Sequence, residues 1–222
     1  MNIIFPMNGT GERFRIAGYE GPKYFLPVLQ STMIQEVSAI YPEYWSRAFA
    51  VWHEDADELA KYFPHDKIIK IYERTFGPVH TLMKPEIIDY ISSCEDIVVA
   101  DCDSFIGDIE DIATEFIESD ADACSPIRQA KERWASYCRI DNELIVETRE
   151  KDPFTKWSTT GPYFWRSGKK YIECAKASGI TDNSPLFNEL IKRQGSVIPI
   201  KTDNFYHIGT PELYRNFINA HS

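Results

Sequence analysis

Glycines and cations lie close together near the N-terminus of this 222-residue chain. An apolar run at residues 3–7 (IIFPM) predicts a short buried strand, and it leads into residues 8–11 (NGTG), with Arg13, Arg15 and Lys23 shortly after. Glycines let successive backbone N–H groups turn toward an anion, and cations just beyond them can neutralise a polyphosphate. The stretch therefore predicts a loop that grips a nucleoside triphosphate. A tight turn without any ligand is the alternative interpretation.

Neither of the two common phosphate-binding signatures accounts for this loop. The dinucleotide fingerprint G-x-G-x-x-G needs a third glycine where the chain has Phe14, and no long helix is expected directly after it. The Walker loop G-x-x-x-x-G-K-[ST] does not occur in residues 3–23. The pattern thus points to a phosphate loop of another kind.

Two carboxylates follow the clearest central strand of the sequence. Residues 97–100 (IVVA) are apolar, and Asp101 and Asp103 come directly after them. In open parallel sheets, ligands gather at the carboxyl ends of the strands. Neighbouring carboxylates are costly to hold together without a cation, and such hard oxygen ligands favour Mg²⁺ or Mn²⁺. The pattern predicts a metal site. A solvated strand end, or an N-cap for a helix near 108–118, is the alternative.

Composition limits the class of protein. Apolar residues make up 43% of the chain and aromatic residues 14%, which is enough for the core of one substantial α/β domain. The formal charge of -10 argues against a general nucleic-acid binder. The five cysteines form no C-x-x-C pair, so neither a zinc site nor a disulfide framework is indicated, and they suit a reducing compartment. Because no signal peptide or membrane span is evident, we expect a cytoplasmic protein with no membrane partner.

The elements expected in the first half alternate between helix and strand. Their order is a helix at 33–41 that begins with a capping box at Thr32 and Gln35, a strand at 47–52, a helix at 55–63, a strand at 67–72, one helix from Pro78 whose buried stripe includes Ile87, and the strand at 97–100. This alternation is typical of a mostly parallel sheet with helices on both of its faces. The predicted fold class is therefore a three-layer α/β fold.

From residue 120 the pattern changes to successive strands. They are expected at 121–128, 134–140 and 144–149, with a hairpin turn at Asp141-Asn142. Helices at 171–177 and 184–193 and a strand at 197–200 follow, the second helix with Asn183 or Ser184 as its N-cap and Pro185 at its first position. A small β meander added to an α/β half commonly forms the second wall of a cleft, so we expect an acceptor side here.

The ordered motifs resemble those of the sugar-phosphate nucleotidyltransferases. That family carries G-x-G-[ST]-R-[LF] followed by P-K about ten residues on, and the matching residues here are Gly9, Gly11, Arg13, Phe14, Pro22 and Lys23. Further matches are a Thr-x-Gly element at Thr75 and Gly77, the carboxylate Asp103 after a strand, an E-K-P-like element at Lys151, a T-G-x-Y-like element at Thr160 and Gly161, and residues 208–212 (IGTPE) near the C-terminus. The resemblance covers nearly the whole chain in the same order.

This resemblance implies a fold, an activity and a set of site residues. The fold would be of the nucleotide-diphospho-sugar transferase type, Rossmann-like, with 1–222 as a single domain, 1–119 as its nucleotide-binding half and 120–222 as its acceptor-binding half. The activity would be transfer of a nucleoside monophosphate from an NTP to a phosphorylated small-molecule acceptor, with release of pyrophosphate. The implied catalytic residues are Arg13, Lys23 and Asp103. The implied nucleotide-binding residues are Met7, Asn8, Gly9, Thr10, Gly11, Thr75, Gly77 and Asp101. The implied acceptor-binding residues are Lys151, Thr160 and Gly161. Asp103, Asp101 and His207 are the expected ligands of Mg²⁺ or Mn²⁺.

The chain departs from the family pattern at several of these positions. Glu12 replaces the usual Ser or Thr, Asp101 replaces an Asn, and Asp152 separates Lys151 from the following proline. The largest departure is His207, which stands where the family has an Asp that acts as a second metal ligand. His207 could bind the metal as a neutral imidazole, contact a phosphate, or be a packed histidine whose carboxylate role has moved to Asp101 or Asp203.

Several questions stay open from the sequence alone. Short family members often serve capsule and other surface-polysaccharide precursors, and several use CTP, so we expect a cytidylyltransferase of that kind without an appended C-terminal domain. The acceptor is either a sugar 1-phosphate or a small non-sugar phosphate, and a homodimer is left open. An Asp-x-Asp glycosyltransferase that uses a sugar nucleotide is the alternative enzyme, since residues 101–103 fit it equally well. A nucleotide-binding protein without catalysis is the alternative outside the enzymes, suggested by His207.

Overall fold

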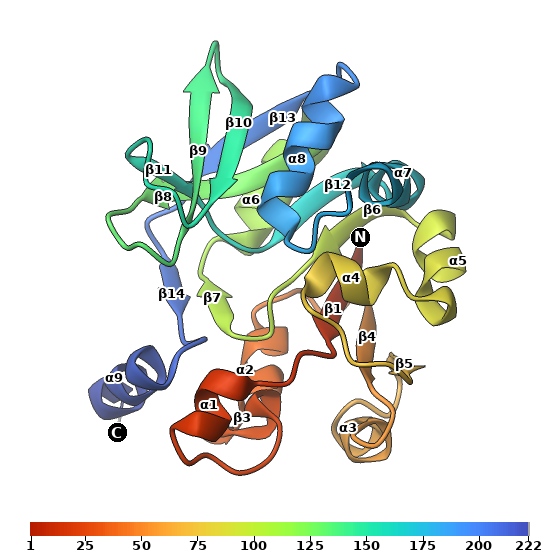
Figure 1. The fold of residues 1–222 in the computed structure, drawn as a ribbon, viewed down its shortest axis with the longest axis vertical. Helices are drawn as coiled ribbons and strands as arrows, with labels where there is room; N and C mark the ends of the chain where they lie inside the picture. Colours follow the sequence, from red (N-terminus) through yellow and green to blue (C-terminus); the bar gives the residue numbers. More distant parts are fainter. Residues whose placement is uncertain (222) are drawn as a thin grey trace.

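The computed structural model describes residues 1–221, which fold around one ten-stranded sheet (Figure 1). Its strand order is β10-β9-β11-β8-β12-β6-β1-β4-β5, and β13 pairs with β8. The strands are β1 (Asn2–Met7), β4 (Ser46–Trp52), β5 (Lys67–Ile71), β6 (Glu95–Val99), β8 (Ala123–Gln129), β9 (Ser136–Asp141), β10 (Leu144–Glu150), β11 (Trp157–Thr159), β12 (Tyr163–Ser167) and β13 (Val197–Lys201). Two small ladders accompany the sheet, β2 (Pro27–Val28) with β3 (Ser31–Thr32), and β7 (Ser104–Ile106) with β14 (Phe205–His207).

The N-terminal half supplies four neighbouring parallel strands. β1 pairs in parallel with both β4 and β6, so that Ile4 lies between Ala48 and Val99, and β4 pairs in parallel with β5. The carboxyl ends of β1 and β6 therefore meet at one edge of the sheet. This edge is where the glycine loop and the Asp101–Asp103 turn were expected to face each other.

The C-terminal half continues the same sheet. β12 pairs with β6 in antiparallel fashion, with Phe164 opposite Val98, and it also pairs with β8. β9 and β10 form the expected hairpin, but its turn lies one residue later than predicted, at Asn142 and Glu143, which have left-handed backbone angles with φ of 47° and 64°. The predicted meander is thus present, and it belongs to the central sheet.

Helices cover both faces of the sheet, as predicted. One face carries α2 (Met33–Ala39), α3 (Ala56–Tyr62) and α6 (Ile109–Glu118), and the other carries α4 (Pro78–Leu82), α5 (Pro85–Ser93), α7 (Gly168–Ser178) and α8 (Asn183–Lys192). Successive strand residues point to opposite faces, so Phe5 and Val98 belong to the first core while Ile4 and Val99 belong to the second. α1 (Glu12–Ile16), a 3₁₀ turn (Lys23–Phe25) and α9 (Pro211–His221) complete the chain. The three-layer α/β fold is confirmed.

The structure differs from the sequence predictions in one divided helix, in the start of another helix and in short strands that were not predicted, besides shifts of one or two residues at other element ends. The helix expected to run from Pro78 past Ile87 is two helices, because Pro85 cannot donate a backbone hydrogen bond and Lys84 before it is extended, with ψ of 143°. α8 begins at Asn183 with Asp182 as its N-cap, which places Pro185 third in the helix. The three-residue strand β11 had not been predicted, since it is too short for its alternation to stand out. No helix within residues 1–221 has the length and apolar character needed to cross a membrane.

Candidate active site

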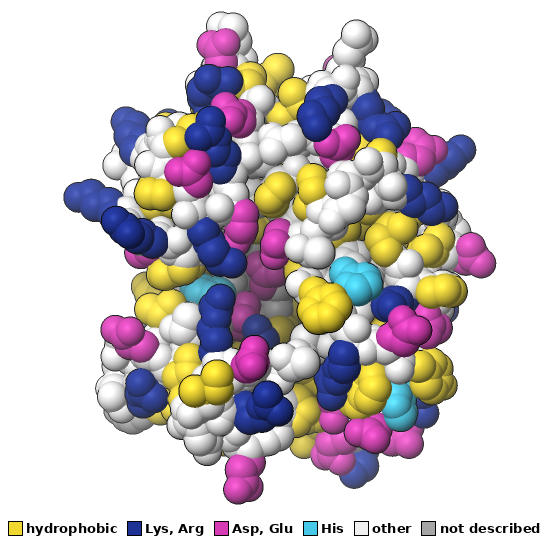
Figure 2. Space-filling model, viewed as in Figure 1, with side chains coloured by type: hydrophobic (Ala, Val, Ile, Leu, Met, Phe, Trp, Pro, Cys, Tyr) yellow, Lys and Arg dark blue, Asp and Glu magenta, His cyan; other side chains and the backbone are white. Residues whose placement is uncertain are grey.

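A cavity of about 320 Å³ opens between the two halves of the chain, at the carboxyl ends of β1 and β6. Figure 2 shows this hollow, with acidic side chains inside it and basic side chains along its margin. Eleven of the predicted site residues line it: Met7, Gly9, Arg13, Lys23, Gly77, Asp101, Asp103, Lys151, Thr160, Gly161 and His207. The fold therefore brings residues that are up to 200 positions apart in the sequence into one cleft.

Four predicted nucleotide-binding residues lie outside the lining of this cavity: Asn8, Thr10, Gly11 and Thr75. The fully buried Asn8 donates from Nδ2 to the carbonyl of Glu73 at 2.6 Å and to Oγ1 of Thr75 at 3.3 Å. Gly11 has a φ of 62° and is the N-cap of the short helix α1. In the described structure, Asn8 and Thr75 join the loop after β1 to the loop after β5, and Gly11 allows the chain to turn into α1.

Lys23 and Asp103 form an ion pair inside the cavity. Lys23 follows Pro22 in the 3₁₀ turn, and its Nζ donates to Oδ2 of Asp103, whose side chain is only 8% exposed. Burial alone would lower the pKa of Lys23, but the charge of Asp103 and smaller contributions from Cys102 and Asp101 outweigh it, so the pKa lies above its usual value. Lys23 is therefore a permanent cation and not a general base.

The pKa values of Asp103 and Asp101 shift in opposite directions: the ionised form of Asp103 is stabilised and that of Asp101 is destabilised. Burial raises the pKa of a carboxyl group, and for Asp103 the charge of Lys23 and the hydrogen bond from it more than offset this effect, so the pKa falls below its ordinary value. For Asp101, burial and repulsion by Asp103 outweigh the attraction of Lys23 and raise the pKa to about 7. Asp101 makes no side-chain hydrogen bond or ion pair with any of residues 1–221, and Gly161 packs so closely that an added Cβ would collide with its carboxylate.

The raised pKa of Asp101 predicts a pH-dependent gain in stability for Asp101→Asn. A carboxyl whose pKa rises from 3.8 in the unfolded chain to about 7 in the fold stabilises the protein fully below pH 4 and loses that contribution as the pH rises through 7. The asparagine variant should therefore unfold with a free energy roughly 2–4 kcal/mol higher than the wild type at pH 8, and similar to it near pH 4. Urea denaturation in EDTA measures both. A variant no more stable than the wild type at pH 8 would contradict the environment described for Asp101.

His207 lies beside the ion pair. Its ring stacks on Trp134 with a centroid separation of 4.7 Å, and Nδ1 lies 3.0 Å from Oγ of Ser104 and 3.8 Å from Oδ1 of Asp103. Burial lowers the pKa of His207, and nearby cations add to this effect while Asp103 opposes it, so the neutral imidazole is favoured. Asp203 is exposed and does not line the cavity. Of the two carboxylates considered as substitutes for the family's second metal ligand, only Asp101 lies in the cleft.

The carboxylates of the cleft fit a divalent cation that shares its coordination with a substrate. No group of three or more His, Cys, Asp or Glu side chains is arranged around a common metal position in residues 1–221. However, magnesium commonly binds one or two carboxylates and completes its shell with water and substrate phosphates. Asp103 and Asp101 supply two such carboxylates on the cavity wall, and Asp101 has no cation partner of its own among the described residues.

The remaining cations differ in their environment. Arg13 lies on α1 at the cavity wall, is exposed, and forms no ion pair within the described part of the chain. Lys151 lies at the opposite wall with a left-handed backbone (φ 55°), and its Nζ is 3.5 Å from Oε1 of Glu150. Arg13 from the N-terminal half and Lys151 from the C-terminal half thus both belong to the lining of the cleft.

Sequence reasoning missed part of the second wall. Trp134, Ser136, Asp182, Asn183 and Ser184 also line the cavity, beside Glu150 of the predicted E-K-P-like element. Asn183 and Ser184 had been considered only as helix caps, and Trp134 and Ser136 only as meander residues. The one signal that could have identified them is the run of polar side chains at residues 182–184 just before an apolar helix, but such a run usually serves capping alone.

Solved structures of other proteins share this fold. The nucleoside-diphosphate-sugar pyrophosphorylase of Vibrio cholerae RC9 superposes with a TM-score of 0.83 at 21% identity, covering 98% of this chain and 99% of that one. The inositol-1-phosphate CTP transferase of T. maritima gives 0.77 at 15% identity, covering 96% and 90%. The UTP-bound UGPase of Acinetobacter baumannii gives 0.77 at 14% identity, covering 99% and 92%.

No protein-family model matches this sequence, and no curated protein does so either. The likeness is therefore one of structure, at identities of 21% or less, and it extends over almost the full length of each chain. The chain has the α/β fold that these pyrophosphorylases and nucleotidyltransferases share.

Proposed function

We propose that this protein is a nucleotidyltransferase that moves a nucleoside monophosphate from an NTP to a phosphorylated acceptor and releases pyrophosphate. The observation that carries the proposal is the shared cavity, in which Arg13 and Lys23 of the N-terminal half face Asp101, Asp103 and the C-terminal wall. We assign the nucleotide to residues 1–119 and the acceptor to residues 120–222. The fold shared with pyrophosphorylases and a CTP transferase supports the same reaction class.

The reaction needs positioning and charge neutralisation rather than a protein nucleophile. An oxygen of the acceptor phosphate attacks the α-phosphorus, the bond from that phosphorus to the bridging oxygen of the β-phosphate breaks, and pyrophosphate leaves in line. Lys23 and Arg13 stabilise the negative charge that develops on the phosphates. Asp103 and Asp101 would hold Mg²⁺ or Mn²⁺, which neutralises and orients phosphate oxygens when bound.

The proposal extends to the donor and to the use of the product. We assign CTP as the donor and a precursor of a capsule or other surface polysaccharide as the product. The support for this is the resemblance of the chain to short cytidylyltransferases of that kind, together with the fold it shares with the T. maritima CTP transferase.

A pyrophosphate-release screen tests the reaction class. The protein is incubated with Mg²⁺, each of the four common NTPs, and a panel of sugar 1-phosphates and non-sugar phosphomonoesters. We expect release that depends on both NTP and acceptor, with CTP as the best donor. Transfer or hydrolysis from a sugar nucleotide, without pyrophosphate release from free NTPs, would instead identify an Asp-x-Asp glycosyltransferase. Tight NTP binding without turnover under any acceptor would identify a binding protein.

A further inference from the structure

The backbone of Lys151 has a conformation that residues with a side chain rarely adopt. Its φ of 55° lies in the left-handed region. β10 ends at Glu150, so Lys151 begins the loop 151–156 that leads to β11, and of the residues in this loop only Lys151 lines the cavity. Such a backbone persists where the surrounding structure fixes it. The contacts of the loop therefore determine where the Lys151 ammonium lies.

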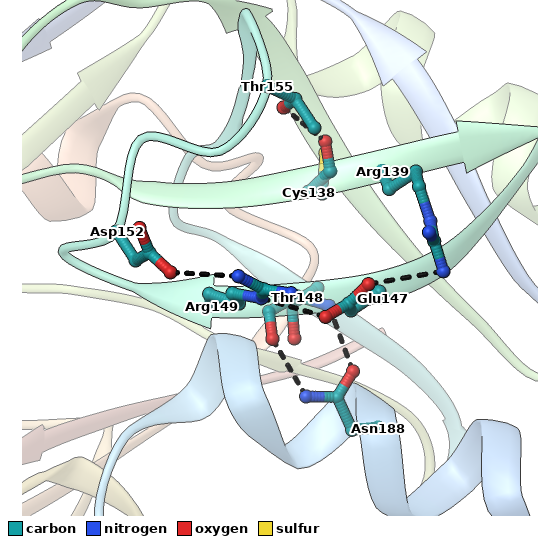
Figure 3. Close-up of polar contacts among 8 residues, drawn as sticks. All are labelled: Cys138, Arg139, Glu147, Thr148, Arg149, Asp152, Thr155 and Asn188. Atoms are coloured by element: carbon teal, nitrogen blue, oxygen red, sulfur yellow. Dashed lines mark hydrogen bonds and ion pairs between the residues drawn. The ribbon is translucent and has the colours of Figure 1, made fainter.

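The guanidinium of Arg149 on β10 holds this loop from outside the cavity. As Figure 3 shows, it bonds Asp152, with Nη1 donating to Oδ2 at 3.0 Å, and Glu147, with Nε donating to Oε1 at 2.7 Å. Its Cζ lies 4.3 Å from the centre of the Phe154 ring, which also packs on the small apolar cluster of Ala130, Ala135 and Tyr137. We name Arg149, Asp152 and Phe154 the Arg149 clamp. None of the three lines the cavity.

Other hydrogen bonds anchor only the two ends of the loop. The backbone N–H of Lys151 donates to the carbonyl of Ala135 at 3.1 Å, and the hydroxyl of Thr155 donates to the carbonyl of Cys138 on β9 at 2.6 Å (Figure 3). The side chain of Asp152 makes no further hydrogen bond or ion pair within residues 1–221. The clamp is thus what joins the middle of the loop to β10.

Asp152 is also the residue by which this chain departs from the E-K-P pattern. A residue directly before a proline is pushed toward extended backbone angles. If Pro153 followed Lys151 directly, the left-handed conformation of Lys151 would be disfavoured, and the intervening Asp152 removes that restriction. The same residue supplies the carboxylate that Arg149 binds. The departure from the pattern therefore carries its own anchor.

We propose that the Arg149 clamp positions the Lys151 ammonium for the phosphate of the acceptor. This inference rests on the proposed nucleotidyl transfer, with Lys151 as an acceptor-binding residue. Arg149 and Asp152 are positioning residues, because they lie outside the cavity and act through the loop. Without the clamp, Lys151 relaxes toward commoner backbone angles and its ammonium leaves its place beside Glu150, where Nζ is 3.5 Å from Oε1. Binding of the NTP in the other half of the chain should not change.

Hydrogen exchange tests the clamp without depending on catalysis. The amides of residues 151–156 should exchange about twofold to tenfold faster in Arg149→Ala and Asp152→Ala than in the wild type, because an exposed ion pair and a cation–π contact each contribute modestly. Arg139→Ala is the matched control. Arg139 lies on the same hairpin and pairs with Glu147 at 3.1 Å, and this ion pair does not involve the loop (Figure 3).

Acceptor kinetics test the consequence for binding, with the best acceptor from the pyrophosphate-release screen. Arg149→Ala should raise the acceptor KM about threefold to tenfold, and Asp152→Ala should raise it less, since the contact with Phe154 remains. Arg149→Lys, which keeps the charge but not the fork, should be intermediate. The kcat and the KM for the NTP should stay within about twofold. In a Lys151→Ala background, Arg149→Ala should have no further effect, because no ammonium is left to position.

Each contrary outcome has a distinct meaning. Unchanged exchange in both clamp variants, or faster exchange with an unchanged acceptor KM, overturns the inference and leaves the nucleotidyl transfer standing. A further rise in the acceptor KM when Arg149→Ala is added to Lys151→Ala also overturns it, since Arg149 would then act other than through Lys151. Absence of pyrophosphate release by the wild type with every NTP and acceptor overturns the proposed function and the inference with it.

Discussion

Lys23→Ala should lower the kcat/KM for pyrophosphate release by about 100-fold or more. The Lys23 ammonium is a permanent cation on the cavity wall, paired with Asp103 and close to where the phosphates of a triphosphate would lie. Preorganised charges of this kind contribute on the order of 100-fold to 1000-fold to rates when they face developing negative charge. Steady-state release of pyrophosphate with saturating Mg²⁺ measures the effect.

Two controls separate the charge of Lys23 from its effect on folding. The alanine variant leaves Asp103 buried without its cation, so some loss of stability is expected, and thermal unfolding measures it. Lys23→Arg keeps the charge and should retain more activity than Lys23→Ala, although the planar guanidinium cannot replace the ammonium in full. Lys192→Ala on the exposed face of α8 should behave as the wild type. Near-normal turnover by Lys23→Ala would show that the chemistry does not depend on this pair.

Asp103→Asn should also reduce kcat by on the order of 100-fold to 1000-fold. Asparagine has nearly the shape of aspartate and can still accept a hydrogen bond from Lys23, so the loss would report the missing charge rather than a changed cavity. Because Asp103 is the carboxylate that stays ionised at neutral pH, we expect the variant to need a much higher Mg²⁺ or Mn²⁺ concentration for half-maximal activity. A metal titration of the rate measures both quantities.

The matched control is Asp89→Asn, which removes one carboxylate from the exposed side of α5 without touching the cavity. It should leave both kcat and the metal dependence unchanged. If Asp103→Asn retained wild-type turnover and metal dependence, the assignment of this carboxylate to metal and phosphate binding would be wrong.

The cleft residues that could be predicted from the sequence are those that lie in short recognisable motifs or next to the end of a strand. The glycine turn follows β1 and Asp103 follows β6, and the ends of both strands are evident in the sequence, so the convergence of these two segments follows from the parallel sheet. Lys23 was predicted from the Pro22-Lys23 motif instead. The fold class was predictable for the same reason, because helix and strand alternate with clear signals.

The site features that could not be predicted from the sequence depend on contacts between segments that are far apart in the chain. The sequence predicts that Asn183 is a helix cap. Its place on the cavity wall depends on its hydrogen bond with Tyr171 and on the hydrogen bonds of the neighbouring Ser184. The charge states of Asp101 and Asp103 are likewise set by burial and by Lys23, so two aspartates two positions apart acquire opposite pKa shifts. The break between α4 and α5 could have been predicted from a local signal, because Pro85 marks it. The apolar residues on both sides of Pro85 fit a single helix, and the prediction followed them.

The antiparallel pairing of β12 with β6 also limits how the two halves of the chain can move. The two halves of the chain are joined by this ladder, in which Tyr163 lies opposite Val99, Trp165 opposite Ile97 and Ser167 opposite Glu95. A clamshell closure, with the halves turning about a hinge, would have to break that ladder. With that ladder intact, the spacing between the two walls of the cleft is set once the chain has folded.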